Sequence, residues 1–286
     1  MKVLVTGGAG YIGSIASHFL AEKGFETVVV DDLSLGHELA VPHQARFYRQ
    51  SLLEKNGLNK IFEKEKPEAV FHFAAFSIVP ESVQKPLVYY QNNVGGAANL
   101  LEAMQKTGCG KIVFSSSAAV YGNPERVPIG ETEPTNPINP YGRSKLWIEQ
   151  MIADAGMEFV FLRYFNAAGA AFGVGESHSP ETHLVPLVMK TANGERESIS
   201  IFGNQYPTKD GTCIRDYVHV QDIARAHALA LDYLEKKGKP DCFNLGTAKG
   251  YSVKEIIQAA EEITKKTGSN QNRFAPGRRS CGTGCI

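Results

Sequence analysis

A tyrosine and a lysine stand four residues apart in the stretch NPYGRSK, which runs from residue 139 to 145. On a helix this spacing places the side chains of Tyr141 and Lys145 on one face, within reach of each other. A free phenol has a pKa of about 10, but a neighbouring positive charge favours the phenolate and lowers that pKa. The pair therefore predicts a general base that removes a proton from a hydroxyl group. The same spacing is also common on ordinary solvated helix faces.

Three consecutive serines, Ser115, Ser116 and Ser117, end the apolar run KIVF. In a parallel sheet covered by helices, ligands bind beyond the carboxyl ends of the strands. The serines are therefore expected to face such a site, where one hydroxyl could hydrogen-bond the oxygen that Tyr141 deprotonates. Serines after a strand are equally common in plain turns, so the three serines indicate a functional site only together with the other motifs.

A glycine-rich loop follows the first apolar run, in VLVTGGAGYIG. Gly8, Gly10 and Gly13 fit the pattern G-x-G-x-x-G, and Gly7 with Gly10 and Gly13 fits G-x-x-G-x-x-G. Missing Cβ atoms let the backbone approach a pyrophosphate, and the following helix N-terminus stabilises its charge. Asp31 ends the next apolar run 18 residues after Gly13, near the position of a ribose-binding carboxylate. This carboxylate would repel a 2′-phosphate, so the loop predicts NAD rather than NADP.

The elements that position these residues alternate between short apolar runs and helical patterns such as Ile12–Lys23 and Val94–Lys106. The apolar runs, typical of strands buried on both faces, are Lys2–Thr6, Glu26–Asp31, Ala69–Phe73, Lys111–Ser115 and Glu158–Arg163. Their order predicts an α/β fold with a doubly wound, Rossmann-type parallel sheet. Gly, Pro and His become frequent after about residue 166. We therefore expect an NAD-binding domain over 1–165 and a smaller substrate-binding region over 166–286, interleaved with the first and incomplete at its C-terminus.

The composition is that of a globular protein with 286 residues, 43 % of them hydrophobic, and a formal net charge of zero. There is no basic field to attract nucleic acid, and no apolar run approaches the ~20 residues of a membrane span. No signal peptide precedes the first strand. The five cysteines do not resemble a disulfide framework, which favours a cytoplasmic protein. No metal-ligand set is predicted.

The glycine loop, the serine and the Tyr-x-x-x-Lys pair together resemble the extended short-chain dehydrogenase/reductase superfamily. Further stretches are similar to the UDP-glucose (UDP-galactose) 4-epimerase family over roughly residues 1–276, and the longest is 201–222. These stretches are DDLSLG, HFAAFSIVPES, YYQNNV, SSSAAVYG, PYGRSK, LRYFNAAGA, IFGNQYPTKDGTCIRDYVHVQD and FNLGT. The resemblance implies an NAD-dependent isomerase of galactose metabolism that acts on a UDP-hexose.

The resemblance also implies a mechanism. NAD takes a hydride from C4 of the hexose while Tyr141 takes the O4 proton, the 4-keto sugar turns over, and the hydride returns to its opposite face. Ser117 would hydrogen-bond the reacting oxygen, and Lys145 would also hold the nicotinamide ribose. Members of the family are commonly homodimers, with an interface that includes Val94–Lys106 and the helix of Tyr141.

The binding residues implied by the resemblance fall into a cofactor set and a substrate set. The cofactor set is Gly7, Gly10, Tyr11, Ile12, Gly13, Asp31, Ser51, Leu52, Phe73, Ala74, Ala75, Asn93, Tyr141, Lys145 and Tyr164. The substrate set comprises the reacting pair, the phosphate ligands, the uracil neighbours and two further residues: Ser117, Tyr141, Asn166, Arg215, Leu184, Phe202, His183 and Arg278.

The chain departs from the family at several positions. Ser51 stands where the family has an aspartate near adenine, and Ala119 replaces a threonine. Arg278 and Arg279 resemble the phosphate-binding arginine pair of the family, but a glycine precedes them, and the residues SCGTGCI that follow match nothing in the family. Our hypothesis is a truncated or frame-shifted C-terminus that leaves the NAD site intact but the lid over the UDP-sugar incomplete.

Alternative activities share this scaffold. A 4,6-dehydratase would need an Asp-Glu pair where Ala118 and Ala119 stand, which argues against it. A UDP-hexuronate or UDP-N-acetylhexosamine 4-epimerase stays open, as does an NAD-binding sensor or an epimerase left inactive by its altered tail.

Overall fold

The computed structural model describes residues 1–178, 181–265 and 274–277. The chain forms two compact units. The first, called the sheet unit, comprises 1–175 and 218–245, and the second, called the small unit, comprises 176–217 and 246–286. This division differs from the expected boundary after residue 165, because residues 218–245 return to the sheet and supply a helix and an edge strand.

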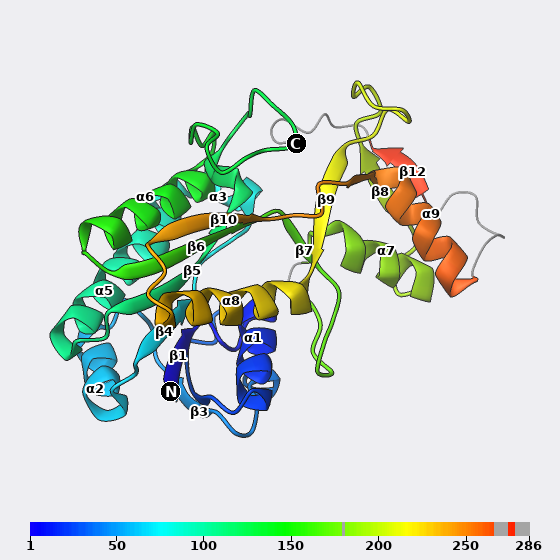
Figure 1. The fold of residues 1–286 in the computed structure, drawn as a ribbon. Helices are drawn as coiled ribbons and strands as arrows, with labels where there is room; N and C mark the ends of the chain where they lie inside the picture. Colours follow the sequence, from blue (N-terminus) through cyan, green and yellow to red (C-terminus); the bar gives the residue numbers. More distant parts are fainter. Residues whose placement is uncertain (179–180, 266–273, 278–286) are drawn as a thin grey trace. The chain divides into compact units, whose positions relative to one another are not determined.

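The sheet unit is built on seven strands in the order β10-β6-β5-β4-β1-β2-β3 (Figure 1). Every neighbouring pair is parallel, which confirms the predicted doubly wound α/β fold. The strands are β1 (Lys2–Thr6), β2 (Glu26–Asp31), β3 (Arg46–Arg49), β4 (Ala69–His72), β5 (Lys111–Ser117), β6 (Glu158–Tyr164) and β10 (Asp241–Leu245).

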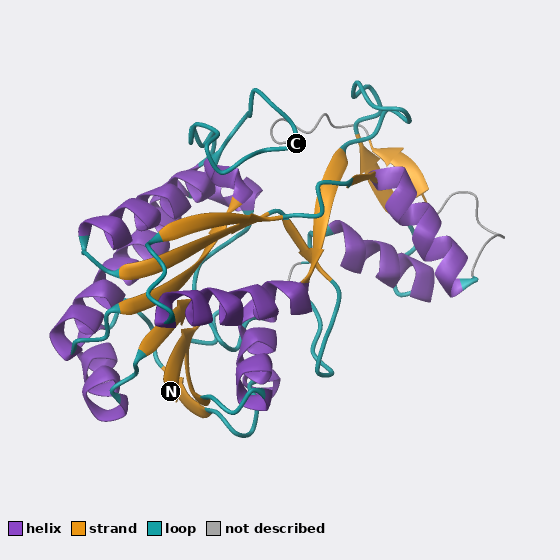
Figure 2. Ribbon diagram, in the orientation of Figure 1, coloured by secondary structure: helices purple, strands orange, loops and turns teal. Residues whose placement is uncertain are grey.

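Helices cover both faces of this sheet, as Figure 2 shows. Leu4 of the central strand β1 packs into one hydrophobic cluster with α2, α5 and α6, whereas Val3 and Val5 pack into another with α1 and α8. The alternation buries both faces of the strand, which explains its continuous apolar sequence. The helices are α1 (Tyr11–Glu22), α2 (Lys55–Glu65), α3 (Val79–Gln84), α4 (Pro86–Tyr89), α5 (Gly96–Thr107), α6 (Pro140–Asp154) and α8 (Val220–Glu235).

Short elements complete the sheet unit. A π-helical turn, Tyr90–Gly95, joins α4 to α5, and 3₁₀ turns occupy Glu38–Ala40 and Ala118–Val120. Strand β7 spans Asn166–Ala168. The register of β5 against β6 pairs Ser115 with Leu162 and Ser117 with Tyr164, so the serines end beside the tyrosine of the RYFN motif.

The small unit has its own core, formed by Val188, Ile199, Ile257 and Ala260. Its helices are α7 (Leu184–Asn193) and α9 (Val253–Thr264). Strand β8 (Ile199–Phe202) pairs in parallel with β12 (Phe274–Gly277), and β11 (Gly250–Ser252) pairs antiparallel with β9 (Ile214–His219). Within the described ranges, no helix is both long enough and apolar enough to cross a membrane.

Candidate active site and cofactor site

The glycine loop between β1 and α1 packs tightly against the backbone that follows β4. Gly7 has a φ of +70°, and a Cβ atom there would lie 2.6 Å from the Ala74 nitrogen. A Cβ on Gly13 would lie 2.2 Å from the Gly7 oxygen. Glycine at both positions is therefore required by the turn and by the close approach of helix to loop.

The start of α1 offers an anion site. Gly10 is the N-cap, no described side chain caps it, and the first turn has no acidic residue. The helix N-terminus and its dipole are therefore available to a negative group. In the same turn, Tyr11 donates its hydroxyl to the Gly169 carbonyl at 2.7 Å, and Ile12 packs into the core. This arrangement fits a pyrophosphate.

Asp31 ends β2 beside the loop. Its carboxylate accepts hydrogen bonds from the Ala9 nitrogen (3.0 Å) and the Leu33 nitrogen (2.8 Å), one on each oxygen. Burial raises the pKa of Asp31, and the two backbone N–H groups oppose that rise. Each oxygen keeps a second acceptor direction, so the carboxylate can receive the two hydroxyls of a ribose. The loop and Asp31 together fit NAD.

The other expected cofactor residues lie near the same edge. Asn93 is buried in the π-helical turn; its Oδ1 accepts from the Phe76 nitrogen (2.8 Å), and its Nδ2 donates to the Phe76 oxygen (3.0 Å) and Ser144 Oγ (3.1 Å). Asn93 therefore ties the loop that contains Phe73, Ala74 and Ala75 to α6. Ser51 Oγ accepts from the Leu53 nitrogen (3.3 Å) in the turn after β3, and Leu52 packs on the core. Their contact with NAD stays a prediction.

The helix of Tyr141 begins with a capping residue followed by proline. Asn139 is the N-cap and its Oδ1 accepts from the Gly142 nitrogen at 2.8 Å, with Pro140 at the first helical position. Tyr141 stands in the first turn and hydrogen-bonds with Ser117 from the end of β5. Lys145 Nζ lies 5.9 Å from the centre of the Tyr141 ring. The structure therefore brings the three predicted catalytic residues together.

Lys145 is held in place by the strand that carries the serines. It is 3 % exposed, and its Nζ donates to the Ser115 carbonyl at 2.8 Å. Burial lowers the pKa of Lys145 to about 7, and the charge of Glu149 opposes that fall. Near neutral pH the lysine is therefore poised between its charged and neutral forms.

The sequence predicts a lowered pKa for Tyr141, but the chain without its cofactor does not lower it. Burial raises the pKa of the Tyr141 phenol, and hydrogen bonding with Ser117 opposes the rise without reversing it. The reason is desolvation, which disfavours the phenolate. A positive charge beside the phenol, such as an oxidised nicotinamide ring or the protonated Lys145, would lower this pKa.

A buried polar network lies beneath these residues and was missed by sequence reasoning. The Glu149 carboxylate accepts from Arg163 Nη2 (2.5 Å), Arg163 Nε (2.9 Å) and Ser116 Oγ (2.5 Å). Tyr164 is buried and hydrogen-bonds through its hydroxyl with Ser115. Two signals could have indicated the network: Glu149 stands four residues after Lys145, and Arg163 interrupts an apolar strand.

The expected substrate residues are divided between the two units. Asn166 begins β7 in the sheet unit. In the small unit, His183 is the N-cap of α7, with Leu184 next to it, and Phe202 ends β8 with 52 % of its surface exposed. Arg215 of β9 has a buried Nη1 that finds no hydrogen-bond partner among the described residues. Arg278 and the altered tail lie outside the described residues.

Comparison with known proteins assigns the family. A family model described as NAD dependent epimerase/dehydratase matches residues 3–246. A UDP-glucose 4-epimerase from Lacticaseibacillus casei is 52 % identical over 270 residues, which cover 92 % of this chain and 82 % of the relative. The crystal structure of UDP-glucose 4-epimerase from Brucella ovis in complex with NAD is 46 % identical, with a TM-score of 0.91, and the match covers 99 % of this chain and 87 % of that one.

A second solved structure gives the same result. UDP-glucose 4-epimerase from Bifidobacterium longum, in complex with NAD⁺ and UDP, is 36 % identical with a TM-score of 0.91, and the match covers 99 % of this chain and 88 % of that one. With the glycine loop and Asp31, these matches make NAD the cofactor. The chain belongs to the NAD dependent epimerase/dehydratase family.

Proposed function

We propose that the protein is a UDP-glucose 4-epimerase, which interconverts UDP-galactose and UDP-glucose. The observation that carries the proposal is the meeting of Ser117, Tyr141 and Lys145 at the carboxyl end of β5, in a chain half identical to a relative of that name. Bound NAD supplies a hydride acceptor and donor at the sugar carbon.

The residues of the chain handle the proton. Tyr141 takes the proton from the hexose O4, keeps it while the sugar is a ketone, and returns it to O4 of the other epimer. The Ser117 hydroxyl, which already hydrogen-bonds with Tyr141, steadies the reacting oxygen. Lys145 is fixed by the Ser115 carbonyl, so its charge, when present, stays near the phenol and stabilises the phenolate.

We propose that Arg215 binds the diphosphate of the substrate. Its buried and unpartnered Nη1 supports this role, because a buried guanidinium donor without an acceptor is costly and a phosphate oxygen would satisfy it. Leu184 and Phe202 would flank the uracil, and Asn166 and His183 would complete the substrate contacts. Arg278 is kept as a second phosphate ligand on the resemblance alone.

The test is conversion of UDP-galactose without added cofactor. UDP-glucose should form, because NAD is retained by the purified protein. Tyr141→Phe should lower turnover by roughly 10²- to 10⁴-fold, the share of general base catalysis, while NAD is still released on denaturation. Tyr251→Phe removes a phenol from β11 and should keep the normal rate. Near-full turnover in Tyr141→Phe would refute the assignment of the base.

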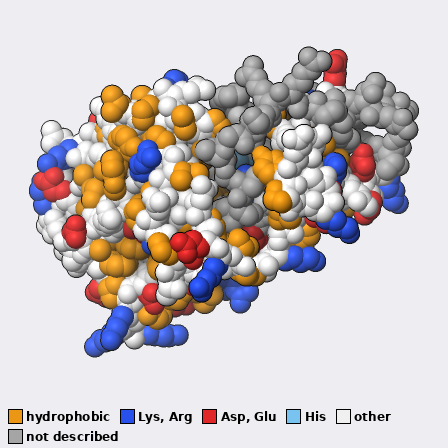
Figure 3. Space-filling model, turned by 90° about the horizontal axis from the view of Figure 1, so that it is seen from above, with side chains coloured by type: hydrophobic (Ala, Val, Ile, Leu, Met, Phe, Trp, Pro, Cys, Tyr) orange, Lys and Arg blue, Asp and Glu red, His pale blue; other side chains and the backbone are white. Residues whose placement is uncertain are grey.

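We also propose that the protein is a cytoplasmic homodimer. Large apolar side chains are exposed on neighbouring helices of the sheet unit: Leu87 (78 %) and Val88 (46 %) on α4, and Trp147 (43 %) on α6. Figure 3, which views the molecule from above Figure 1, shows hydrophobic side chains among polar ones on its surface. The free thiols of Cys109 and Cys242 fit a reducing compartment. A molar mass of one chain by light scattering would refute the dimer.

A further inference from the structure

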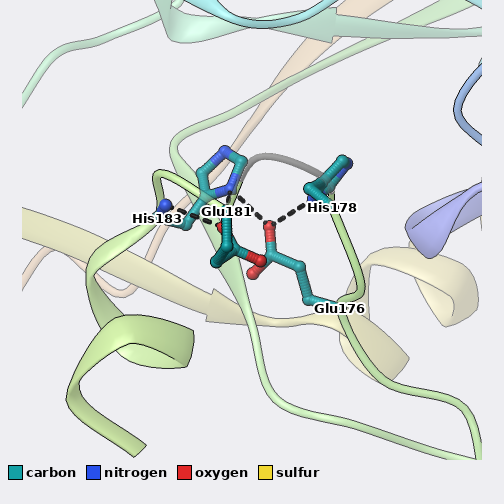
Figure 4. Close-up of side chains that lie close together, drawn as sticks. All are labelled: Glu176, His178, Glu181 and His183. Atoms are coloured by element: carbon teal, nitrogen blue, oxygen red, sulfur yellow. Dashed lines mark hydrogen bonds and ion pairs between the residues drawn. The ribbon is translucent and has the colours of Figure 1, made fainter. Parts of the chain in front are cut away.

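Four side chains that can ligate a metal converge in the small unit, just before α7. They are Glu176, His178, Glu181 and His183, and one donor atom from each lies within 4.8 Å of the others (Figure 4). We propose that this cluster, called the Glu-His cluster, binds a divalent transition-metal ion such as Zn²⁺. The proposal shares His183 with the substrate contacts proposed above, and it differs from the sequence prediction, which named no metal ligands.

The two imidazoles of the Glu-His cluster lie close to its two carboxylates. His183 Nδ1 lies 2.7 Å from Glu176 Oε1 and 2.9 Å from Glu181 Oε1. His178 Nδ1 lies 3.2 Å from the same Glu176 oxygen. Because each Nδ1 carries at most one hydrogen, the single hydrogen of His183 has two carboxylates to serve. Glu181 Oε1 also accepts from the backbone nitrogens of Thr182 and His183, each at 2.8 Å. The acceptor left without a donor is Glu181 Oε2, and a cation would satisfy it.

The carboxylates are also buried. The Glu176 side chain is 8 % exposed and that of Glu181 is 4 % exposed. Glu181 Oε2 is buried and has no hydrogen-bond partner in the part of the chain that the structure describes. Figure 4 shows the Glu181 carboxylate turned toward the other three side chains. Two buried carboxylates side by side need a positive charge, and a divalent ion balances them when both imidazoles are neutral.

The donor set selects the class of metal. Two imidazole nitrogens with two carboxylate oxygens suit Zn²⁺ and its transition-metal neighbours, whereas Mg²⁺ and Ca²⁺ prefer oxygen ligands. Tetrahedral Zn²⁺ with bonds of 2.0–2.2 Å places its donors about 3.4 Å apart. The donors of the Glu-His cluster lie up to 4.8 Å apart, so binding would draw the most distant pair together by about 1.4 Å. All four ligands come from one short segment, so this contraction needs no movement of a distant element.

A metal here would fix the start of α7. His183 is the N-cap of that helix, and its backbone N–H donates to Glu181 Oε1 at 2.8 Å. Ligation of both residues would therefore lock the turn that leads into Leu184. The expected consequence is a higher melting temperature when the metal is bound, because binding to the folded state alone stabilises it.

The test measures Zn²⁺ binding to the full chain by isothermal titration calorimetry, with metal analysis after dialysis. Cys281 and Cys285 are replaced by serine in every sample, because thiolates are also good zinc ligands. One Zn²⁺ per chain should bind. His178→Asn and Glu181→Gln should each weaken binding by more than the roughly tenfold that loss of an outer-shell partner costs. His43→Asn, at an exposed histidine outside the cluster, should change affinity less than about twofold.

Two outcomes would overturn the proposal. One is the absence of stoichiometric Zn²⁺ binding in the parent protein, and the other is equal affinity in the parent and in both ligand variants. Circular dichroism of each variant shows whether it is folded. Co²⁺ titration gives a second readout, since a four-coordinate nitrogen and oxygen site produces visible absorption that should be lost in His178→Asn and kept in His43→Asn.

Discussion

Replacing Glu149 by glutamine should destabilise the protein far more than the loss of one surface charge. Glu149 and Arg163 are both buried, and the carboxylate accepts three short hydrogen bonds, two from Arg163 and one from Ser116. Glutamine has nearly the same shape but offers only one acceptor oxygen. Its amide N–H₂ would face the guanidinium, so a hydrogen-bond donor of glutamine would lie against a donor of Arg163 in place of the present ion pair.

The expected cost follows from the charge left behind. Arg163 is 7 % exposed, so water cannot replace the lost carboxylate, and Arg163 keeps its bond to the Tyr121 hydroxyl at 3.0 Å. Removing one partner of a buried ion pair typically costs about 3–5 kcal/mol. One hydrogen bond to the glutamine oxygen is retained, which offsets about 1 kcal/mol. We therefore expect a loss of about 3 kcal/mol in the free energy of unfolding.

Urea denaturation followed by circular dichroism measures this loss. Glu102→Gln is the matched control, because Glu102 pairs with Lys55 and Lys106 on an exposed surface of the sheet unit. That change should cost less than about 1 kcal/mol. Arg163→Met in the Glu149→Gln background should recover part of the stability, because the unpaired charge is then gone.

Two results would contradict this expectation. One is a loss of unfolding free energy in Glu149→Gln no larger than that in Glu102→Gln. The other is that Arg163→Met destabilises the Glu149→Gln variant as much as it destabilises the parent protein. A functional consequence should accompany the loss. Glu149 opposes the fall in the pKa of Lys145, so glutamine should lower that pKa further. If the ammonium form supports turnover, the alkaline limb of the pH–rate profile should move to lower pH in Glu149→Gln and stay in place in Glu102→Gln.

Two further perturbations test the lysine and the loop. Burial lowers the pKa of Lys145 to about 7 from 10.5, so between these values the unfolded chain binds a proton that the folded chain lacks, and stability rises with pH. In the NAD-free parent protein, the free energy of unfolding should rise by about 2 kcal/mol more between pH 7 and 9 than it does in Lys145→Met. If the free energies of unfolding of the two proteins changed in parallel with pH, the lowered pKa of Lys145 would be refuted. Gly13→Ala should reduce NAD retention and stability, because its Cβ would lie 2.2 Å from the Gly7 oxygen. Gly110→Ala should retain NAD, because a Cβ there would have nothing within 4 Å. Equal NAD content in both variants would contradict the packing of the loop.

The sheet could be predicted because its physical cause is local. Strands buried on both faces must be continuously apolar, and the five predicted runs match β1, β2, β4, β5 and β6 within two residues at their ends. The edge strands do not follow this rule. β3 (Arg46–Arg49) begins and ends with arginine, and β10 (Asp241–Leu245) contains two polar residues, Asp241 and Asn244, among its five. An edge strand has one neighbour and a partly solvated face, so its pattern is weak.

The proximity of the proposed catalytic residues could be predicted because chemistry restricts their types and spacing. The environment around them could not be predicted. Tyr141 and Lys145 share a helix, so their proximity follows from four-residue spacing. The desolvation that raises the pKa of Tyr141 depends on tertiary packing, and no pattern in the sequence measures it. The Glu-His cluster was missed for the opposite reason: its ligands lie close in sequence, but on an irregular segment where spacing has no fixed geometry.

The pKa values of the site link activity to retention of the cofactor. In the chain alone, burial holds the Tyr141 phenol protonated and Lys145 near its midpoint at neutral pH, so the base is weak. Stabilising the phenolate requires a positive charge beside it. The glycine loop, which we expect to bind the pyrophosphate, is packed against the backbone after β4, and Asn93 ties that backbone to the helix of Tyr141. We therefore expect binding of NAD and activation of the proposed base Tyr141 to be coupled through this edge of the sheet.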